Sequence, residues 1–316
     1  MKNRFLKHVL ILLPVAVVLS AFAGILHAMT DHKEIYPVTR VSVILPHKDD
    51  GYWDLIMEGI EEAGCESGSK FNIDINTLIP QLNYNISQIT DLVKQQIAAK
   101  VDYIVVQGNE DEEFLSVLRD ACEQGIHVVC VDTDIRDFPE HLYVGSDNYQ
   151  GGKMLGEHLL ELTGGTAKVA VLSGSEEYLN LQQRLEGFRD ATEEHPEIEI
   201  TEIAYDNYDG LTAMRLYQEM SDQADALVCL EGTCGMTLEA LYDEHRDEYK
   251  YVIGFDAHDG AKKGVLDGIV KQDTNRMGHQ VVEEIRRHIE TGSYSSNCIY
   301  TDIFWVTAEN YDEVMG

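Results

Sequence analysis

The chain has 316 residues, of which 24 are Lys or Arg and 56 are Asp or Glu, so its formal net charge is −32. A balance that acidic argues against nucleic acid or an anionic membrane surface as the main partner. Hydrophobic residues make up 44% and charged residues 25%, which is ordinary for a globular protein and excludes a wholly disordered chain. Six cysteines are too few for a small fold built on disulfides.

The first 28 residues differ in composition from the rest. Lys2, Arg4 and Lys7 precede an apolar run from Val9 to Leu26 that contains no Asp, Glu, Lys or Arg. A basic start before an apolar run is typical of an export signal, and this run also just reaches the length that spans a bilayer. Residues 1–28 are therefore either a cleaved signal peptide or an N-terminal membrane anchor. Both alternatives place the remaining residues outside the cytoplasm.

From residue 40 onward, short apolar segments alternate with segments in which apolar residues recur at helical spacing. Strands are predicted in the first half at 40–45, 71–78, 103–106 and 127–131. Helices are predicted between them at 52–63, 85–99 and 113–123. Asn85 is expected to cap the second of these helices, and Gly125 is expected to stop the third.

The same alternation restarts near residue 146. Strands are predicted at 168–172, 198–204, 226–230 and 251–254. Helices are predicted at 179–193, 211–220, 236–245 and near 260–266. Strands that alternate with helices indicate βαβ units on parallel sheets, so the fold class is α/β with two similar halves.

In parallel α/β sheets, ligands bind outside the carboxyl ends of the strands. This rule selects the segments that follow five predicted strands, namely 46–53, 132–133, 173–182, 231–234 and 255–256. We therefore expect the functional residues in these segments.

Six short segments in this order and at this spacing carry a family resemblance. They are VILPHKDDGYW from residue 43, VCVDTD from 129, VGSDNYQGG from 144, QRLEGF from 183, VIGFD from 252 and VKQD from 270. Together they resemble the type I periplasmic binding proteins, and specifically the sugar receptors similar to ribose-binding protein. The resemblance implies two Rossmann-like lobes with parallel sheets, joined by three crossovers, with the ligand cleft between them. It places the first lobe at 39–145 plus 274–301 and the second at 146–273 plus 302–316.

The resemblance also implies the positions that contact the ligand. They are Asp50, Tyr52, Trp53, Asp132, Thr133, Gln182, Thr233, Asp256 and Gln272. These residue types suit a sugar, because aromatic faces cover its C–H face while carboxylates accept hydrogen bonds from its hydroxyl groups. Gln and Thr side chains can both donate and accept.

Two departures from the family pattern bear on the ligand. Thr133 and Gln182 stand where many of these sugar receptors have Arg, and Arg184 nearby could serve only to brace its helix. The expected cleft is therefore rich in carboxylates and poor in bases. A sugar-like ligand is expected, and a polyol, an amino sugar or another amine-bearing molecule remains an alternative.

Several of these residues also have a purely structural interpretation. Tyr52 and Trp53 could be core residues at a helix start, Asp132 and Asp256 could be turn or cap residues, and Asp50 could cap a helix.

Capping and hinge geometry are expected for two further residues, Asp147 and Asn148, in preference to ligand contact. Cys229 is expected in the core. Cys234 lies near a predicted helix start, but no His or Cys partner is expected nearby in the sequence.

The chain contains no His-Glu-x-x-His, Cys-x-x-Cys, phosphate-binding Gly-rich loop, nucleophile elbow or EF-hand pattern. No cofactor, metal or catalytic residue is therefore predicted. An α/β enzyme is disfavoured because no nucleophile–base set is recognisable. A DNA-binding repressor with the same two-lobe core is disfavoured because residues 1–28 are apolar rather than a basic helix-turn-helix.

The favoured function is that of a non-catalytic, extracytoplasmic receptor for a sugar-like ligand. We expect it to close on the ligand and present the closed form to an ABC permease in the membrane. The alternative partner is a membrane sensor such as a histidine kinase, which would make the chain a signalling co-receptor.

Overall fold

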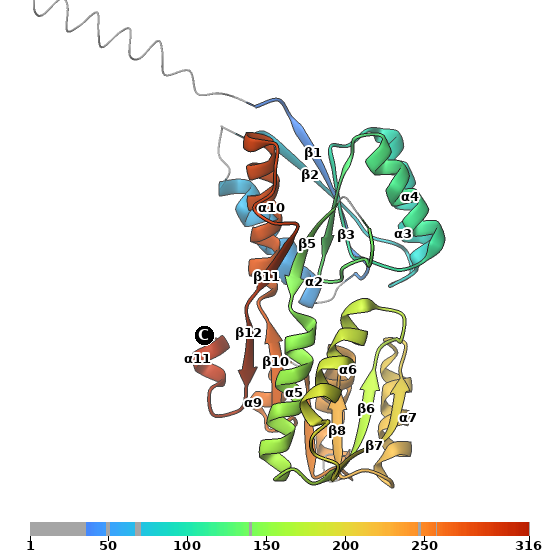
Figure 1. The fold of residues 1–316 in the computed structure, drawn as a ribbon, viewed down its shortest axis with the longest axis vertical. Helices are drawn as coiled ribbons and strands as arrows, with labels where there is room; N and C mark the ends of the chain where they lie inside the picture. Colours follow the sequence, from blue (N-terminus) through green and yellow to red (C-terminus); the bar gives the residue numbers. More distant parts are fainter. Residues whose placement is uncertain are drawn as a thin grey trace, which may run out of the picture.

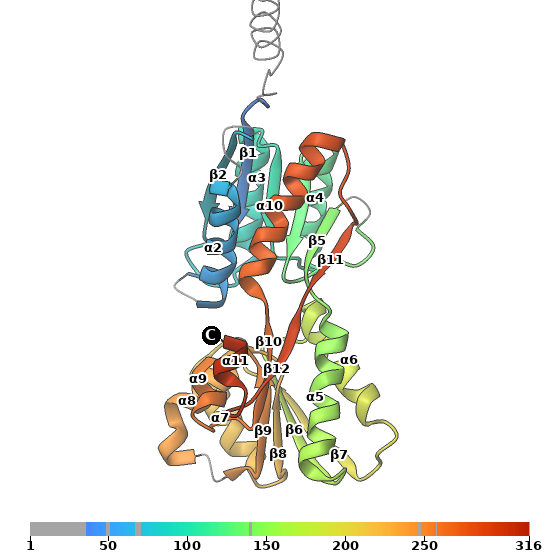
Figure 2. The same cartoon turned by 90° about the vertical axis from the view of Figure 1, so that its left-hand side faces the viewer.

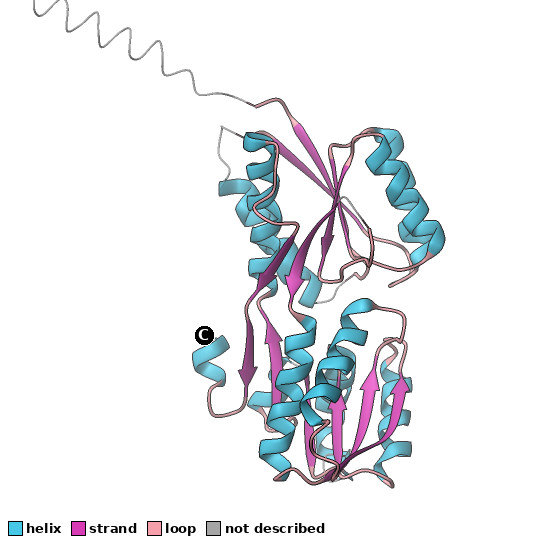
Figure 3. Ribbon diagram, viewed as in Figure 1, coloured by secondary structure: helices cyan, strands magenta, loops and turns pink. Residues whose placement is uncertain are grey.

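The structure is a computed structural model that describes residues 36–48, 51–66, 71–138, 141–245, 248–256 and 258–315. Two lobes lie end to end along the long axis of the molecule (Figure 1). Each lobe has one six-stranded sheet as its middle layer, with helices on both faces (Figure 3). The predicted α/β class with two parallel-sheet lobes is thus confirmed.

The sheet of the first lobe is entirely parallel. Its strand order is β11 (Cys298–Thr301), β5 (His141–Ser146), β4 (His127–Val131), β3 (Tyr103–Val106), β1 (Thr39–Ile44) and β2 (Ile73–Leu78). The helices of this lobe are α2 (Gly51–Glu66), α3 (Ile86–Ala99), α4 (Glu112–Glu123) and α10 (Thr274–Thr291).

The sheet of the second lobe repeats this order, except that its outer strand β12 is antiparallel to β10. The strand order is β12 (Ile303–Val306), β10 (Gly268–Gln272), β9 (Tyr251–Phe255), β8 (Ala226–Cys229), β6 (Ala167–Ser173) and β7 (Ile198–Tyr205). The helices are α5 (Asn148–Thr163), α6 (Leu179–Thr192), α7 (Gly210–Ser221), α8 (Gly232–His245), α9 (His258–Lys262) and α11 (Tyr311–Met315).

Both faces of each sheet are buried, which explains why the central strands are continuously apolar. Successive side chains of a strand point to opposite faces. In the first lobe, Val105 and Val129 belong to the core cluster beneath α2 and α10, whereas Ile104 and Val128 belong to the cluster beneath α3 and α4.

The chain passes between the lobes three times (Figure 2). The crossings lie between β5 and α5, between β10 and α10, and between β11 and β12. Each crossing is a single residue between the two elements, and in each case this residue is an aspartate. Asp147 caps α5 and Asp273 caps α10, each through its side-chain oxygen. The backbone N–H of Asp273 donates to the carbonyl of Asp302 at 3.1 Å, which joins two of the crossings.

The sequence predicted the central elements well. Strands β3 and β4 have the predicted bounds, and Asn85 caps α3 by accepting from the N–H of Gln88. Gly125 follows α4 at φ 80°, in the left-handed region that a glycine adopts readily.

Helix α8 begins at Gly232, four residues before its predicted start. The carboxylate of Glu231 accepts from the N–H groups of Thr233 and Cys234, at 2.7 and 3.3 Å. This carboxylate satisfies the first donors of the helix, so the helix can begin directly after Glu231.

Helix α9 spans His258–Lys262 rather than the predicted 260–266. Gly264, two residues after the helix, adopts φ 72°, and the N–H of Val265 donates to the carbonyl of Gly260 at 2.9 Å. The chain therefore turns away from the helix before Leu266.

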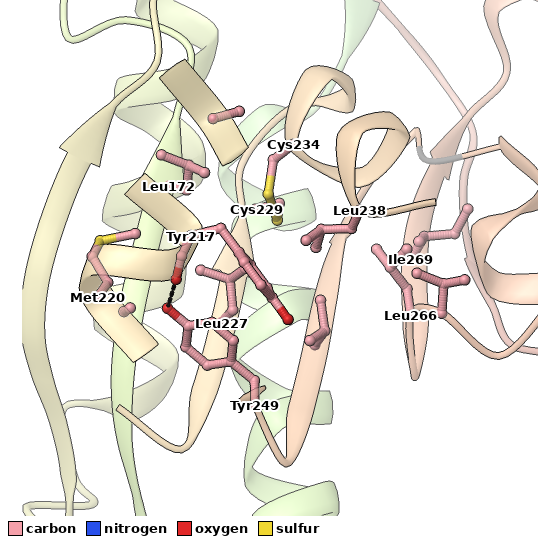
Figure 4. Packing of buried hydrophobic residues seen from close by; sticks show 14 of the residues in the cluster. Leu172, Tyr217, Met220, Leu227, Cys229, Cys234, Leu238, Tyr249, Leu266 and Ile269 are labelled. Atoms are coloured by element: carbon pink, nitrogen blue, oxygen red, sulfur yellow. Dashed lines mark hydrogen bonds between the residues drawn. A yellow bond between two sulfur atoms is a disulfide. The ribbon is translucent and has the colours of Figure 1, made fainter. Parts of the chain in front are cut away.

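Cys229 and Cys234 form a disulfide between the end of β8 and the first turn of α8 (Figure 4). The expectation that Cys234 has no partner nearby in the sequence was therefore wrong. Both cysteines are buried in the core of the second lobe, as expected for Cys229. The same core contains Tyr249, whose hydroxyl donates to the carbonyl of Tyr217 at 3.0 Å.

No helix within the described ranges is both long and apolar enough to cross a membrane. Residues 1–28, to which the prediction of a signal peptide or membrane anchor applies, lie outside the described residues.

Candidate ligand-binding site between the lobes

A pocket enclosing about 560 Å³, part of it open to solvent, lies between the carboxyl ends of the two sheets. The pocket is lined by Tyr52, Trp53, Tyr84, Gln107, Asp132, Asn180, Leu181, Arg184, Tyr208, Glu231, Gly232, Thr233, Met236, Asp256 and Gln272. Both lobes contribute side chains to it.

Asp132 directly follows β4 and is 3% exposed. Its carboxylate accepts from the hydroxyls of Tyr52 and Thr133 at 2.5 and 2.7 Å, and from the amide of Gln107 at 2.9 Å. A fourth donor, the amide of Asn180 at 3.3 Å, comes from the second lobe. Asp132 is therefore a carboxylate held by protein donors and in contact with both lobes.

Asp256 is the corresponding residue of the second lobe and directly follows β9. Its carboxylate accepts from the side-chain amide of Gln272 at 2.6 Å and from the backbone N–H of Gln272 at 3.2 Å. Burial raises the pKa of Asp256, and the nearby Arg184 guanidinium opposes that rise. Among the described residues, the side-chain oxygen of the buried Gln272 has no hydrogen-bond partner. This oxygen is thus an acceptor that a ligand hydroxyl could use.

Arg184 is the buried cation of the pocket and is 2% exposed. It donates to the side-chain oxygen of Asn148 at 2.9 Å and to the carbonyl of Leu230 at 2.8 Å. Its guanidinium lies 3.9 Å from the centre of the Phe255 ring. Arg184 therefore braces its helix, which was one interpretation of the sequence. It also lines the pocket.

Close packing of α5 on α6 fixes the position of this arginine. A side chain at Gly152 would come within 1.9 Å of the Arg184 carbonyl, and one at Gly187 within 2.0 Å of the Tyr149 carbonyl. The two helix backbones therefore touch, which requires glycine at both positions.

Trp53 and Tyr52 form part of an aromatic wall. Trp53 is 2% exposed, belongs to the core of the first lobe and also lines the pocket. The same side chain can therefore be a core residue and still contact a ligand. Its ring N–H donates to the hydroxyl of Tyr84 at 3.1 Å. Tyr84 in turn stacks on Tyr208 of the second lobe.

Two further acids lie side by side in the second lobe. Glu231 lines the pocket, and burial raises its pKa. Asp206, which is fully buried, accepts from the N–H of Tyr208 at 2.8 Å. Burial, reinforced by the nearby Glu231, raises the pKa of Asp206 to about 8. The pair therefore retains a proton near neutral pH.

Most positions implied by the resemblance lie in the pocket lining. They are Tyr52, Trp53, Asp132, Thr233, Asp256 and Gln272. Thr133 is fully buried behind Asp132 and does not line the pocket. Asp50 lies outside the described residues.

Gln182 also lies outside the pocket lining. Its side-chain oxygen accepts from Arg136 of the first lobe, and its amide donates to the carbonyl of Glu176 at 2.6 Å. It therefore bridges the two lobes rather than facing the pocket.

Several lining residues were not predicted as individual positions, namely Tyr84, Gln107, Asn180, Tyr208, Glu231 and Met236. Gln107 directly follows β3, and Tyr208 lies three residues after β7. The rule on carboxyl ends of strands, applied to these two strands as well, would have selected both residues.

Comparison with known proteins agrees with this architecture. A family described as "Periplasmic binding protein domain" matches residues 41–293. The chain is 25% identical to the D-ribose/D-allose-binding protein of Pseudomonas aeruginosa over 267 residues, which cover 81% of this chain and 82% of that protein.

Two solved structures illustrate the range of proteins with this fold. One is GanP, a glucose-galactose binding protein from Geobacillus stearothermophilus, with a TM-score of 0.80 and 26% identity; the match covers 87% of this chain and 99% of that one. The other is the fructose-binding periplasmic domain of a hybrid two-component system, with a TM-score of 0.77 and 18% identity, covering 87% and 93% of the two chains. The family match spans most of the chain, so this protein belongs to the periplasmic binding protein family and is an extracytoplasmic binding protein rather than an enzyme.

Proposed function

We propose that this chain is a receptor that closes its two lobes on a sugar or sugar-like small molecule and presents the closed form to an ABC permease. The observation that carries the proposal is the placement of Asp132 and Asp256, one from each lobe, in the lining of a single pocket. A ligand that bonds to both carboxylates binds the closed arrangement better than an open one, which is the condition for ligand-driven closure.

The chemistry of the pocket supports a hydroxylated ring as the ligand. Tyr52 and Trp53 offer aromatic surface, the two carboxylates accept from hydroxyl groups, and Gln272 and Thr233 can donate or accept. Relatives and structural neighbours are named for ribose, allose, glucose and galactose. We include Asp50, Thr133 and Gln182 in the proposed site, the latter two as supporting residues because they do not line the pocket.

A neutral sugar is favoured over an amine-bearing ligand. Asp132 already accepts from four protein donors, so its charge is stabilised without a ligand cation. Arg184 supplies one positive charge to the pocket. The neighbouring pair of Asp206 and Glu231 retains a proton near neutral pH, because the pKa of Asp206 is raised to about 8, so the pair adds fewer than two negative charges at the pocket.

We propose lobe boundaries within one residue of the interlobe crossings, with 39–145 plus 274–301 in the first lobe and 146–273 plus 302–316 in the second. The aspartates at the crossings cap α5 and α10 or bond to one another. Lobe closure would therefore change backbone angles at these few residues while the caps keep the adjoining helices intact.

We also propose that Val9–Leu26 anchors the chain in the membrane, with a cleaved signal peptide as the alternative. Fractionation of producing cells, followed by N-terminal sequencing, decides between them. A membrane-bound product that begins at Met1 supports the anchor, and a soluble product that begins near Gly24 or Met29 contradicts it.

A membrane sensor such as a histidine kinase is the second candidate partner. The fold match to a periplasmic domain of a hybrid two-component system favours it. Deletion of the chain distinguishes the two roles. Loss of ligand uptake supports the permease partner, whereas intact uptake with loss of ligand-induced transcription supports the sensor.

A thermal-shift screen tests the ligand class. The purified protein is mixed with D-ribose, D-allose, D-glucose, D-galactose, a set of polyols and a set of primary amines. Ligand at 100 times its dissociation constant stabilises the native state by about 2.7 kcal/mol, a shift that is readily measured. Stabilisation by neutral sugars supports the proposal, and stabilisation by amines alone contradicts the assigned class.

A further inference from the structure

Three side chains with metal-binding atoms meet in the first lobe, outside the pocket lining. They are Cys130, Asp134 and His141, and one ligand-type atom of each lies within 4.8 Å of the other two. The Cys130 side chain is fully buried, whereas the side chains of His141 and Asp134 are 11% and 31% exposed. The cluster is therefore covered but still reachable from solvent.

The backbone explains why the three meet. Cys130 lies on β4 and His141 begins the neighbouring strand β5, with Val128 paired to His141 in the parallel register. Because alternate residues of a strand share a face, Cys130 and His141 point to the same side of the sheet. The segment that follows β4 carries Asp134 and packs on that side through Ile135 and Phe138, which belong to the same core cluster as Cys130.

The orientation of the imidazole is fixed by a second contact. Nδ1 of His141 lies 2.8 Å from the carbonyl of Phe138, and a carbonyl can only accept, so Nδ1 carries a proton. In a neutral ring, Nε2 then presents its lone pair to Asp134, whose Oδ1 lies 2.6 Å away. Two acceptors at that distance require either a proton or a metal cation between them.

This arrangement resembles the way proteins orient metal-binding histidines. Such histidines usually donate their other ring N–H to a carbonyl or carboxylate, which sets the tautomer and aims the free nitrogen. The Oδ1 atom of Asp134 is likewise oriented, because it accepts from the N–H of Ile135 at 2.8 Å. Both side chains are therefore held in place by the backbone.

We propose that Cys130, Asp134 and His141 bind a divalent transition metal of the zinc class. Thiolate, imidazole and carboxylate are all ligands of Zn²⁺, which binds in tetrahedral geometry and leaves one position here for water. Ligand atoms around such an ion lie roughly 3.5 Å apart. The Nε2–Oδ1 distance of 2.6 Å is shorter than this value and no pair of the three atoms exceeds 4.8 Å, so small side-chain movements suffice. Binding releases the thiol proton of Cys130 to solvent, since the thiolate is the ligand form.

The bound ion would join the carboxyl end of β4 to the start of β5. Asp132 and Thr133 lie in the connection between these points. Metal binding is therefore expected to stiffen the backbone that presents Asp132. The proposed metal site does not depend on the identity of the sugar ligand.

Titration of the metal-free full-length protein with cobalt chloride and with zinc chloride tests the proposal. Co²⁺ should bind at one site per chain and produce a near-ultraviolet thiolate-to-cobalt band with visible bands of a tetrahedral ion. Zinc should displace it and raise the melting temperature. Cys130→Ser, His141→Gln and Asp134→Asn should each weaken zinc binding at least about 10-fold, as loss of one ligand predicts.

The chain offers matched controls. Cys65→Ser replaces an exposed free cysteine, and His158→Gln replaces a histidine that also contacts an acid, Glu161 at 2.9 Å. Neither control should change zinc binding. A cobalt complex without the thiolate band, or unchanged zinc affinity in the three site variants, overturns the proposal. A third outcome also overturns the proposal: the wild type binds no zinc, and His141→Gln has a lower melting temperature than the wild type without metal. That outcome identifies a protonated His–Asp ion pair instead of a metal site.

Discussion

Tyr84 of the first lobe lies flat against Tyr208 of the second lobe, with ring centroids 4.4 Å apart and ring planes within 16° of parallel. Both residues adopt left-handed backbone angles, with φ of 54° and 58°, which large side chains seldom do. Such backbone persists only where the surrounding structure enforces it. The stack joins the two lobes and forms one wall of the pocket.

Removing this stack should weaken ligand binding, because it contributes to the closed form that the ligand requires. Aromatic pairs contribute about 0.5–1.5 kcal/mol beyond their buried area, so Tyr208→Ala should raise the dissociation constant at least roughly 2- to 10-fold. Tyr36→Ala is the control, since Tyr36 stacks on Phe71 within the first lobe at 5.1 Å. Calorimetric titration measures the ligand affinity of both variants. If Tyr208→Ala binds the ligand as tightly as Tyr36→Ala, the stack does not contribute to binding.

Replacing Trp53 should affect both stability and affinity. The side chain is 2% exposed, so Trp53→Ala leaves a core cavity and should lower the unfolding free energy by about 3–5 kcal/mol. Trp53→Phe keeps more of the packing but loses the hydrogen bond to Tyr84, which makes it the better test of binding.

Fluorescence isolates the ligand-facing role of Trp53. In a Trp305→Phe background, Trp53 is the one remaining tryptophan, and its emission should change when ligand is added. Unchanged emission at saturating ligand would show that Trp53 acts in the core alone.

The fold could largely be predicted where local pattern and tertiary structure agree. Strands β3 and β4 are buried on both faces and are therefore unbroken apolar runs. Strand β11 was not predicted as an element, because it lies at the sheet edge and exposes Cys298 and Tyr300. Helix α8 begins earlier than predicted because the Glu231 side chain accepts from its first N–H groups. The spacing of apolar residues, on which the prediction was based, does not indicate such a cap.

The site could be predicted only in part. Asp132 and Asp256 follow directly from strand ends, where parallel sheets bind ligands. Tyr84 comes from a loop whose left-handed backbone is set by tertiary contacts, so no local pattern indicates it. Gln182 bridges the lobes through Arg136, a contact that depends on how the lobes close.

The buried acid pair predicts a pH dependence of stability. The pKa of Asp206 rises from 3.8 to about 8 on folding, so the native state holds more protons than the unfolded state between these values. The contribution of this group to stability is therefore fully present below about pH 4 and is lost as pH rises toward 8. Urea unfolding at pH 5 and pH 8 should show a larger loss of stability for the wild type than for Asp206→Asn. An equal loss in both proteins would contradict the assigned protonation.

The most direct test of the account is calorimetric titration with the neutral sugar that stabilises the protein most. The wild type should bind one molecule per chain, and Asp132→Ala and Asp256→Ala should each bind roughly 10- to 100-fold more weakly, since losing a charged hydrogen bond costs about 1.5–3 kcal/mol. Asp132→Ala should also destabilise the ligand-free protein, because three donors of its own lobe lose their acceptor. Unchanged affinity in both variants, or no binding of any neutral sugar by the wild type, would contradict the proposed site.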